Sequence, residues 1–79
     1  MSREIYEIAK EIRKDWKKVN YAAEPYLDAM EQLVSVDSMY YLDSAASVVR
    51  YFLSNAKTWR GDVARRVKVE LNKMVEGKY

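Results

Sequence analysis

The fold is decided by residues 2–19, which read SREIYEIAKEIRKDWKKV. Apolar side chains recur there every three or four positions, which is the spacing of one face of an α-helix. They are Ile5, Ile8, Ala9, Ile12, Trp16 and Val19. Ser2 is placed to cap such a helix, and Glu4 in the first turn suits its positive end. The pattern predicts an amphipathic helix over residues 2–18.

The same spacing recurs in three further segments, so the sequence predicts four helices. They cover residues 2–18, 25–35, 44–56 and 59–76. Pro25 suits the first turn of the second helix, while Asp43 and Thr58 are suitable caps for the third and fourth. A short helical turn is predicted near residues 38–42. Four helices with short connections predict an all-α fold, a compact bundle in a single domain of residues 1–79.

Composition excludes several classes of site. The 79 residues contain no cysteine and no histidine, which excludes disulfides, the usual zinc ligands and histidine-assisted nucleophiles. Two glycines cannot form a Gly-rich phosphate loop. The sequence therefore predicts a protein that is not an enzyme, with no catalytic residue, cofactor or metal site. No apolar run is long enough to span a membrane and no signal segment is seen, so we expect a cytoplasmic location.

Charge is distributed in three zones along the chain. Residues 1–19 carry six basic and four acidic side chains, and residues 20–47 carry five acids with no Lys or Arg. Residues 48–79 carry eight basic and three acidic side chains. The net charge of +2 therefore hides an acidic middle between two basic ends. These zones can pair inside the fold or offer a basic surface to a partner.

Basic residues on the outer faces of the first and last helices are the best functional lead. Helical projection leaves six of them with few local partners, and together they form the candidate binding surface. They are Arg3, Lys10, Lys14, Lys17, Arg65 and Lys68. Asp62 and Glu70 stand four residues either side of Arg66, which predicts that they hold Arg66 on the helix surface. The candidate surface either contacts phosphates or is a solubilising face.

Arg60 is the exception among the basic residues. It falls within the projected apolar stripe of the last helix, where a charge needs a partner or must reach solvent. The acidic middle zone supplies two candidates, so we expect a structural ion pair of Arg60 with Asp37 or Asp43. Such a pair would dock the last helix against the turn at residues 37–43.

Residues 51–66 read YFLSNAKTWRGDVARR, and residues 4–12 read EIYEIAKEI. Both stretches resemble small uncharacterised helical proteins of bacteriophages and prophages. The resemblance implies an intracellular accessory protein that binds a host or phage macromolecule without catalysis. It carries no site residue.

The sequence thus predicts a small non-catalytic accessory protein, with a protein-interaction module as the favoured function. The alternative is a nucleic-acid-binding protein that uses the basic faces of the first and last helices. In that case residues 44–76 could form a helix-turn-helix that presents Arg60, Asp62, Arg65 and Arg66, of which Asp62 would repel phosphate. An unknown protein partner is favoured, nucleic acid and a homodimer stay open, and no membrane partner is expected.

Overall fold

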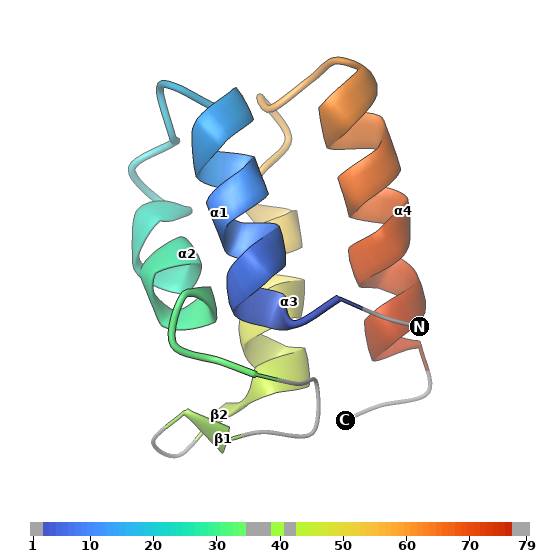
Figure 1. Cartoon of the computed structure of the whole chain (residues 1–79). Coiled ribbons are helices and arrows are strands. Elements are labelled where there is room, and N and C mark those ends of the chain that lie inside the picture. Colours follow the sequence, from blue (N-terminus) through green and yellow to red (C-terminus); the bar gives the residue numbers. More distant parts are fainter. Residues whose placement is uncertain (1–2, 35–38, 41–42, 77–79) are drawn as a thin grey trace.

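The computed structural model describes residues 3–34, 39–40 and 43–76, and four helices form the framework of this part of the chain (Figure 1). They are α1 (Ile5–Asp15), α2 (Glu24–Met30), α3 (Ala45–Ser54) and α4 (Asp62–Val75). Helix α1 packs against α2 and α4, and α3 packs against the same two helices. Successive helices run in opposite directions along the bundle. The predicted all-α bundle of four helices is confirmed, although each helix is shorter than predicted.

Helix α1 begins later and ends earlier than predicted. Its N-cap is Glu4, whose backbone N–H donates to the Glu7 carboxylate at 3.0 Å. The predicted cap, Ser2, lies outside the described residues. The helix ends at Asp15, since Trp16 adopts φ −93° and ψ 89° and places its indole in the core. A distant packing partner therefore ends this helix.

Serine and glycine cap the last two helices. The Ser44 hydroxyl accepts a hydrogen bond from the Ser47 N–H at 3.1 Å and caps α3, so the predicted cap Asp43 is wrong. Helix α4 begins after Gly61, whose φ of 115° lies in the left-handed region that glycine adopts with least strain. The turn at Gly61 interrupts the predicted earlier start, so the predicted cap Thr58 is wrong as well.

A small strand pair stands where the sequence predicts a helical turn. Strands β1 (Met39–Tyr40) and β2 (Asp43–Ser44) pair antiparallel, with the first residue of β1 opposite the last of β2. The predicted turn near residues 38–42 is therefore wrong where β1 stands, and its remaining residues lie outside the described part of the chain. The pair lies at the end of the bundle where α3 begins (Figure 1).

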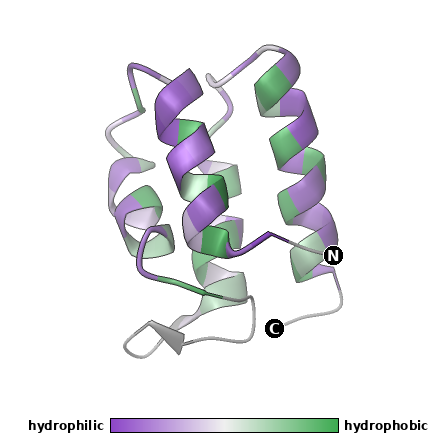
Figure 2. Cartoon of the chain, in the orientation of Figure 1, coloured by the Kyte–Doolittle hydropathy of each residue, from purple (hydrophilic) through white to green (hydrophobic). Residues whose placement is uncertain are grey.

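The core is built from the apolar stripes of the four helices, which alternate with hydrophilic residues along each ribbon (Figure 2). Every buried side chain among the described residues is apolar. The rings of Trp16 and Trp59 stack with centroids 5.8 Å apart, and Phe52 packs edge-on against both. Aromatic contacts of this kind contribute about 0.5–1.5 kcal/mol each beyond their buried area. This cluster fixes the connection between α3 and α4 against the end of α1.

Candidate nucleic-acid interface

Two arginines join α1 to α4. Arg3 donates from Nε and Nη2 to the two carboxylate oxygens of Glu70, at 3.1 and 2.7 Å, and its Nη1 lies 2.6 Å from Glu11. Arg66 contacts the same Glu11 carboxylate from α4. The side chains of Glu11 and Glu70 are both 26% exposed, so water screens these bridges only in part. We call these four residues the α1–α4 seam.

The seam favours the charged forms of Glu11 and Arg3. Burial opposes ionisation of Glu11, but the hydrogen bonds from Arg66 and Arg3 outweigh it and lower the pKa of this carboxyl. The pKa of Arg3 is raised, and its hydrogen bond to Glu70 is the largest cause. Because Arg66 pairs with Glu11 across the seam, its predicted pairing along α4 with Asp62 and Glu70 is wrong.

Arg13, which stands outside the candidate binding surface, joins α1 to α2. Its guanidinium lies 2.8 Å from Glu24 and 3.1 Å from Glu31, and it also contacts Asp28. Burial disfavours its charge, but the hydrogen bonds to Glu24 and Glu31 raise the pKa of Arg13. Three acids of the acidic middle zone therefore serve to dock one arginine.

Basic residues outnumber acidic ones at the end of the bundle where α1 leads into α2 and α3 leads into α4. Both connections lie at this end (Figure 1). The stack of Trp16 on Trp59 joins them, and Asn20 Nδ2 donates to the Asn55 carbonyl at 3.2 Å. Residues 14–23 and 55–65 carry six cations, which we call the cationic end. They are Lys14, Lys17, Lys18, Lys57, Arg60 and Arg65.

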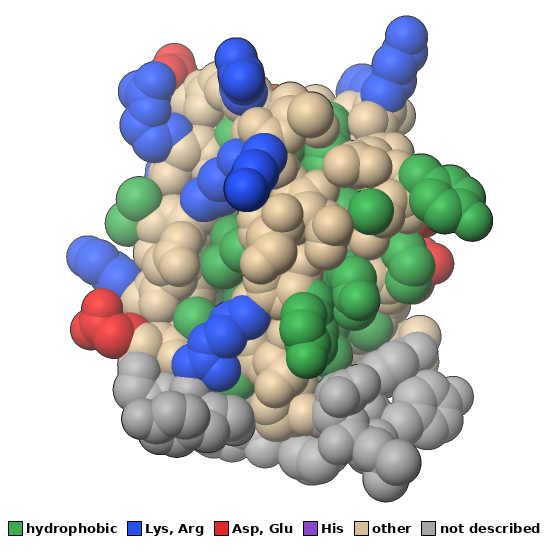
Figure 3. Space-filling view, turned by 180° about the vertical axis from the view of Figure 1, so that it is seen from behind, with side chains coloured by type: hydrophobic (Ala, Val, Ile, Leu, Met, Phe, Trp, Pro, Cys, Tyr) green, Lys and Arg blue, Asp and Glu red, His purple; other side chains and the backbone are tan. Residues whose placement is uncertain are grey.

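The cationic end has little negative charge to offset it. Of the two acids in the same ranges, Asp15 accepts a hydrogen bond from the Trp59 Nε1–H at 2.8 Å. Asp62 lies 3.7 Å from Arg65, and these side chains are 100% and 79% exposed, so their attraction is weak. No other ion pair of the six cations is found among the described residues. Lys and Arg side chains gather toward this end of the molecule (Figure 3).

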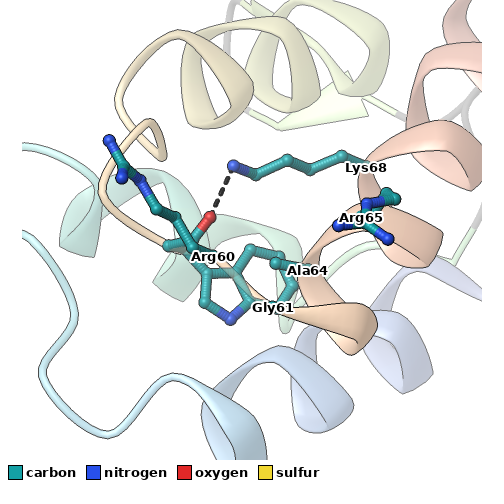
Figure 4. A pocket seen from close by; sticks show the side chains of 6 residues that line it. Arg60, Gly61, Ala64, Arg65 and Lys68 are labelled. Atoms are coloured by element: carbon teal, nitrogen blue, oxygen red, sulfur yellow. Dashed lines mark hydrogen bonds between the residues drawn. The ribbon is translucent and has the colours of Figure 1, made fainter.

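A surface hollow of about 340 Å³ opens at the start of α4 (Figure 4). We call it the Trp59 hollow, and it is lined by Trp59, Arg60, Gly61, Ala64, Arg65 and Lys68. The Lys68 ammonium donates to the Trp59 carbonyl at 2.7 Å and lies 5.8 Å from the centre of the indole ring. Loss of hydration lowers the pKa of Lys68, and the charge of Arg60 lowers it further. The hollow therefore gathers like charges, and its lining contains no carboxylate.

The six residues of the candidate binding surface lie in different regions of the structure and do not form one surface. Arg3 belongs to the α1–α4 seam, so its charge is already matched. Lys10 lies apart, with its ammonium 5.7 Å from the centre of the Tyr6 ring on the same helix. The other four belong to the cationic end or the Trp59 hollow: Lys14, Lys17, Arg65 and Lys68.

Sequence reasoning missed two cations and misplaced a third. Lys18 and Lys57 are both exposed, and the sequence alone does not indicate that the two connections carrying them lie at one end of the bundle. Arg60 precedes α4 and is exposed, so it is not in the apolar stripe. It lies beyond the end of α3 opposite to Asp43, and a helix of 10 residues is about 15 Å long. The side chain of Asp43 and the whole of Asp37 lie outside the described part of the structure, so the predicted ion pair of Arg60 stays a prediction.

The described residues contain no group of three or more acidic side chains arranged to hold a metal ion. In the same part of the chain, no helix combines the length and the apolar character that crossing a membrane requires. Comparison with protein-family models, curated proteins and solved structures finds no match for this chain.

Proposed function

We propose that the protein is a non-catalytic binding module that docks nucleic acid through the cationic end. The observation that carries the proposal is that cations between the helices have carboxylate partners, whereas those of the cationic end have almost none among the described residues. Arg3, Arg13 and Arg66 are each matched by carboxylates, whereas one exposed acid, Asp62, contacts the described cationic end. Phosphates would supply the missing negative charge, and release of their counterions favours binding. The intracellular, phage-type setting belongs to the same proposal.

Single-stranded nucleic acid suits this end of the bundle better than a duplex. The cations are spread over two connections and the adjoining helix turns, rather than along one helix face that could enter a groove. Tyr21, which stands in the first connection, is 92% exposed and offers a ring on which a base can stack. The proposed contacts are with phosphates and base faces, so binding would depend little on sequence.

Matched double variants test the proposal through the salt dependence of binding to a single-stranded oligonucleotide. Lys17→Gln with Lys57→Gln removes two charges from the cationic end. Lys10→Gln with Lys73→Gln removes two exposed charges elsewhere. For single strands, log K falls with log salt by roughly 0.7 per neutralised phosphate, so the first pair should reduce the slope by about 1.4. The second pair should leave the slope nearly unchanged.

Circular dichroism and thermal unfolding provide the folding control, since surface substitutions of this kind change stability by about 0.5 kcal/mol at most. An equal loss of affinity in the two double variants would contradict the proposal, because it would show that position does not matter. Failure of the unaltered protein to bind the oligonucleotide at low salt would contradict it as well.

A second candidate function is the protein-interaction module that the sequence favours. The observation for it is an aromatic pair between α2 and α3: the rings of Tyr26 and Tyr51 have centroids 5.4 Å apart, and Tyr51 is 50% exposed. Hydrophobic side chains group on one side of the view in Figure 3. Tyrosine is enriched at protein interfaces. Under this proposal Tyr51→Ser would abolish partner binding or self-association in sedimentation experiments and leave oligonucleotide binding intact.

A further inference from the structure

We infer that the Trp59 hollow seats a phosphate monoester and thereby holds the phosphorylated end of a nucleic-acid strand. The inference depends on the proposed function for the identity of the strand. Binding of phosphate itself, at what we call the phosphate seat, depends on the residues of the hollow alone.

The charge of the hollow suits a dianion. Arg60, Arg65 and Lys68 bring three positive charges to its lining, which holds no carboxylate. Asp62 offsets Arg65 weakly, at 3.7 Å and in full contact with solvent. A phosphodiester inside a strand carries one negative charge, whereas a monoester, with a second pKa of about 6, carries almost two at neutral pH. The end of a strand therefore matches this charge better than its interior.

The hollow is formed before any ligand arrives. Trp59 is 2% exposed and forms a fixed wall, because its Nε1–H is bonded to Asp15 at 2.8 Å. Lys68 spends one N–H donor on the Trp59 carbonyl at 2.7 Å, which leaves two donors for an anion. In the view of Figure 4 the Lys68 ammonium lies between the guanidinium groups of Arg60 and Arg65. A phosphate bound by the Lys68 ammonium would therefore lie in the positive field of both arginines.

Burial and the nearby charge of Arg60 both disfavour the charged form of Lys68. Its pKa is lowered by loss of hydration and, further, by the charge of Arg60. Arg3, Arg13 and Arg66 do not face unbalanced positive charge in this way, since each has a carboxylate partner. An anion in the hollow would relieve the repulsion and favour the charged form of Lys68.

Titration of the full chain with inorganic phosphate at constant ionic strength tests the seat, with NMR as the readout. The backbone amides of Gly61 and Ala64 are expected to shift saturably. Lys68→Met keeps the aliphatic stem and should weaken phosphate binding by about tenfold or more, because it removes a charge-assisted hydrogen bond. Lys73→Met, an exposed position on the same helix, is the matched control and should leave binding unchanged.

Two oligonucleotides of identical sequence identify the source of the phosphate, one with a 5′-phosphate and one with a 5′-hydroxyl. Tighter binding of the phosphorylated strand, with the advantage lost in Lys68→Met, supports the inference. Saturable binding of inorganic phosphate with no advantage for the phosphorylated strand overturns the strand end as ligand and assigns the seat to a free small phosphate.

Absence of a saturable shift at Gly61 and Ala64 overturns the seat. That failure is distinct from failure of the proposed function, which is decided by the dependence of oligonucleotide binding on Lys17 and Lys57. Arg60→Gln, at an exposed position in the connection, is a second variant whose fold does not depend on the altered side chain. It should weaken phosphate binding in the same direction as Lys68→Met.

Discussion

The α1–α4 seam and the Trp59 hollow each contain two arginines and differ in the acids around them. In the seam, Arg3 and Arg66 are matched by Glu11 and Glu70, and the four charges cancel across the helix interface. In the hollow, three cations share a lining that holds no carboxylate. Cations belong to the scaffold when the fold supplies their partners, and they are available to a ligand when it does not. The presence or absence of carboxylate partners therefore distinguishes the two regions better than the number of basic residues does.

Glu11→Gln removes a negative charge from the α1–α4 seam and has the largest expected effect on stability. It weakens the shared acceptor of Arg3 and Arg66 in a partly shielded position. We expect the free energy of unfolding to fall by about 1–2 kcal/mol. Urea denaturation at low salt measures it, with Glu76→Gln at the exposed end of α4 as control. A loss no larger than that of the control would remove the seam from the scaffold.

The same glutamate predicts a dependence on acid. The pKa of Glu11 is lowered in the fold from its ordinary 4.5, so its contribution to stability is fully present above that value. The contribution is lost as the pH falls through the lowered pKa, because the unfolded chain takes up the proton first. The difference in unfolding free energy between the unaltered protein and Glu11→Gln should therefore shrink toward acid pH.

Lys68→Met probes the hollow and is expected to differ from Glu11→Gln in both size and pH dependence. Its stability should stay within about 0.5 kcal/mol of the unaltered protein at neutral pH, since loss of the hydrogen bond to the Trp59 carbonyl is offset by relief of desolvation and of the repulsion from Arg60. The pKa of Lys68 is lowered from its ordinary 10.5, so the unaltered protein should gain stability as the pH rises through the lowered pKa toward that value. Lys68→Met should lack this gain. Destabilisation as large as that of Glu11→Gln would place Lys68 in the scaffold.

Asp62→Asn has the smallest expected effect on stability. It removes the one acid found in contact with the cations of the cationic end in the described part of the chain. The Asp62 side chain is fully exposed, so the melting temperature should change little. Oligonucleotide affinity should rise, because the one acid found in contact with the described cationic end is lost. Calorimetric titration at low salt measures the change. Unchanged or weaker binding would argue against phosphate contacts near Arg65.

Helical spacing was sufficient to predict four helices, but their ends depend on contacts that spacing does not contain. Trp16 leaves α1 to stack on Trp59, which is 43 residues further along the chain. Gly61 sets the start of α4 through a backbone angle that few other residues adopt readily. In both places a tertiary contact or a single residue overrides a local pattern that would continue the helix.

The candidate site was predictable in part. Glu24, Asp28 and Glu31 follow the i, i+4, i+7 spacing of one helix face, so an acidic stripe on α2 could have been found from the sequence. Its partner, Arg13, could not, because that choice depends on which helix lies beside α2. That the connections carrying Lys18 and Lys57 lie at the same end of the bundle likewise follows from the order of the helices rather than from either local sequence.

The stacked indoles have an optical consequence. The chain contains two tryptophans, and both stand in this stack, with centroids 5.8 Å apart and planes 12° from parallel. Chromophores this close couple electronically, so the tryptophan fluorescence of the whole protein reports one junction at the base of the hollow. Occupancy of the hollow should therefore change the emission of the native chain, and binding can be followed without an attached dye.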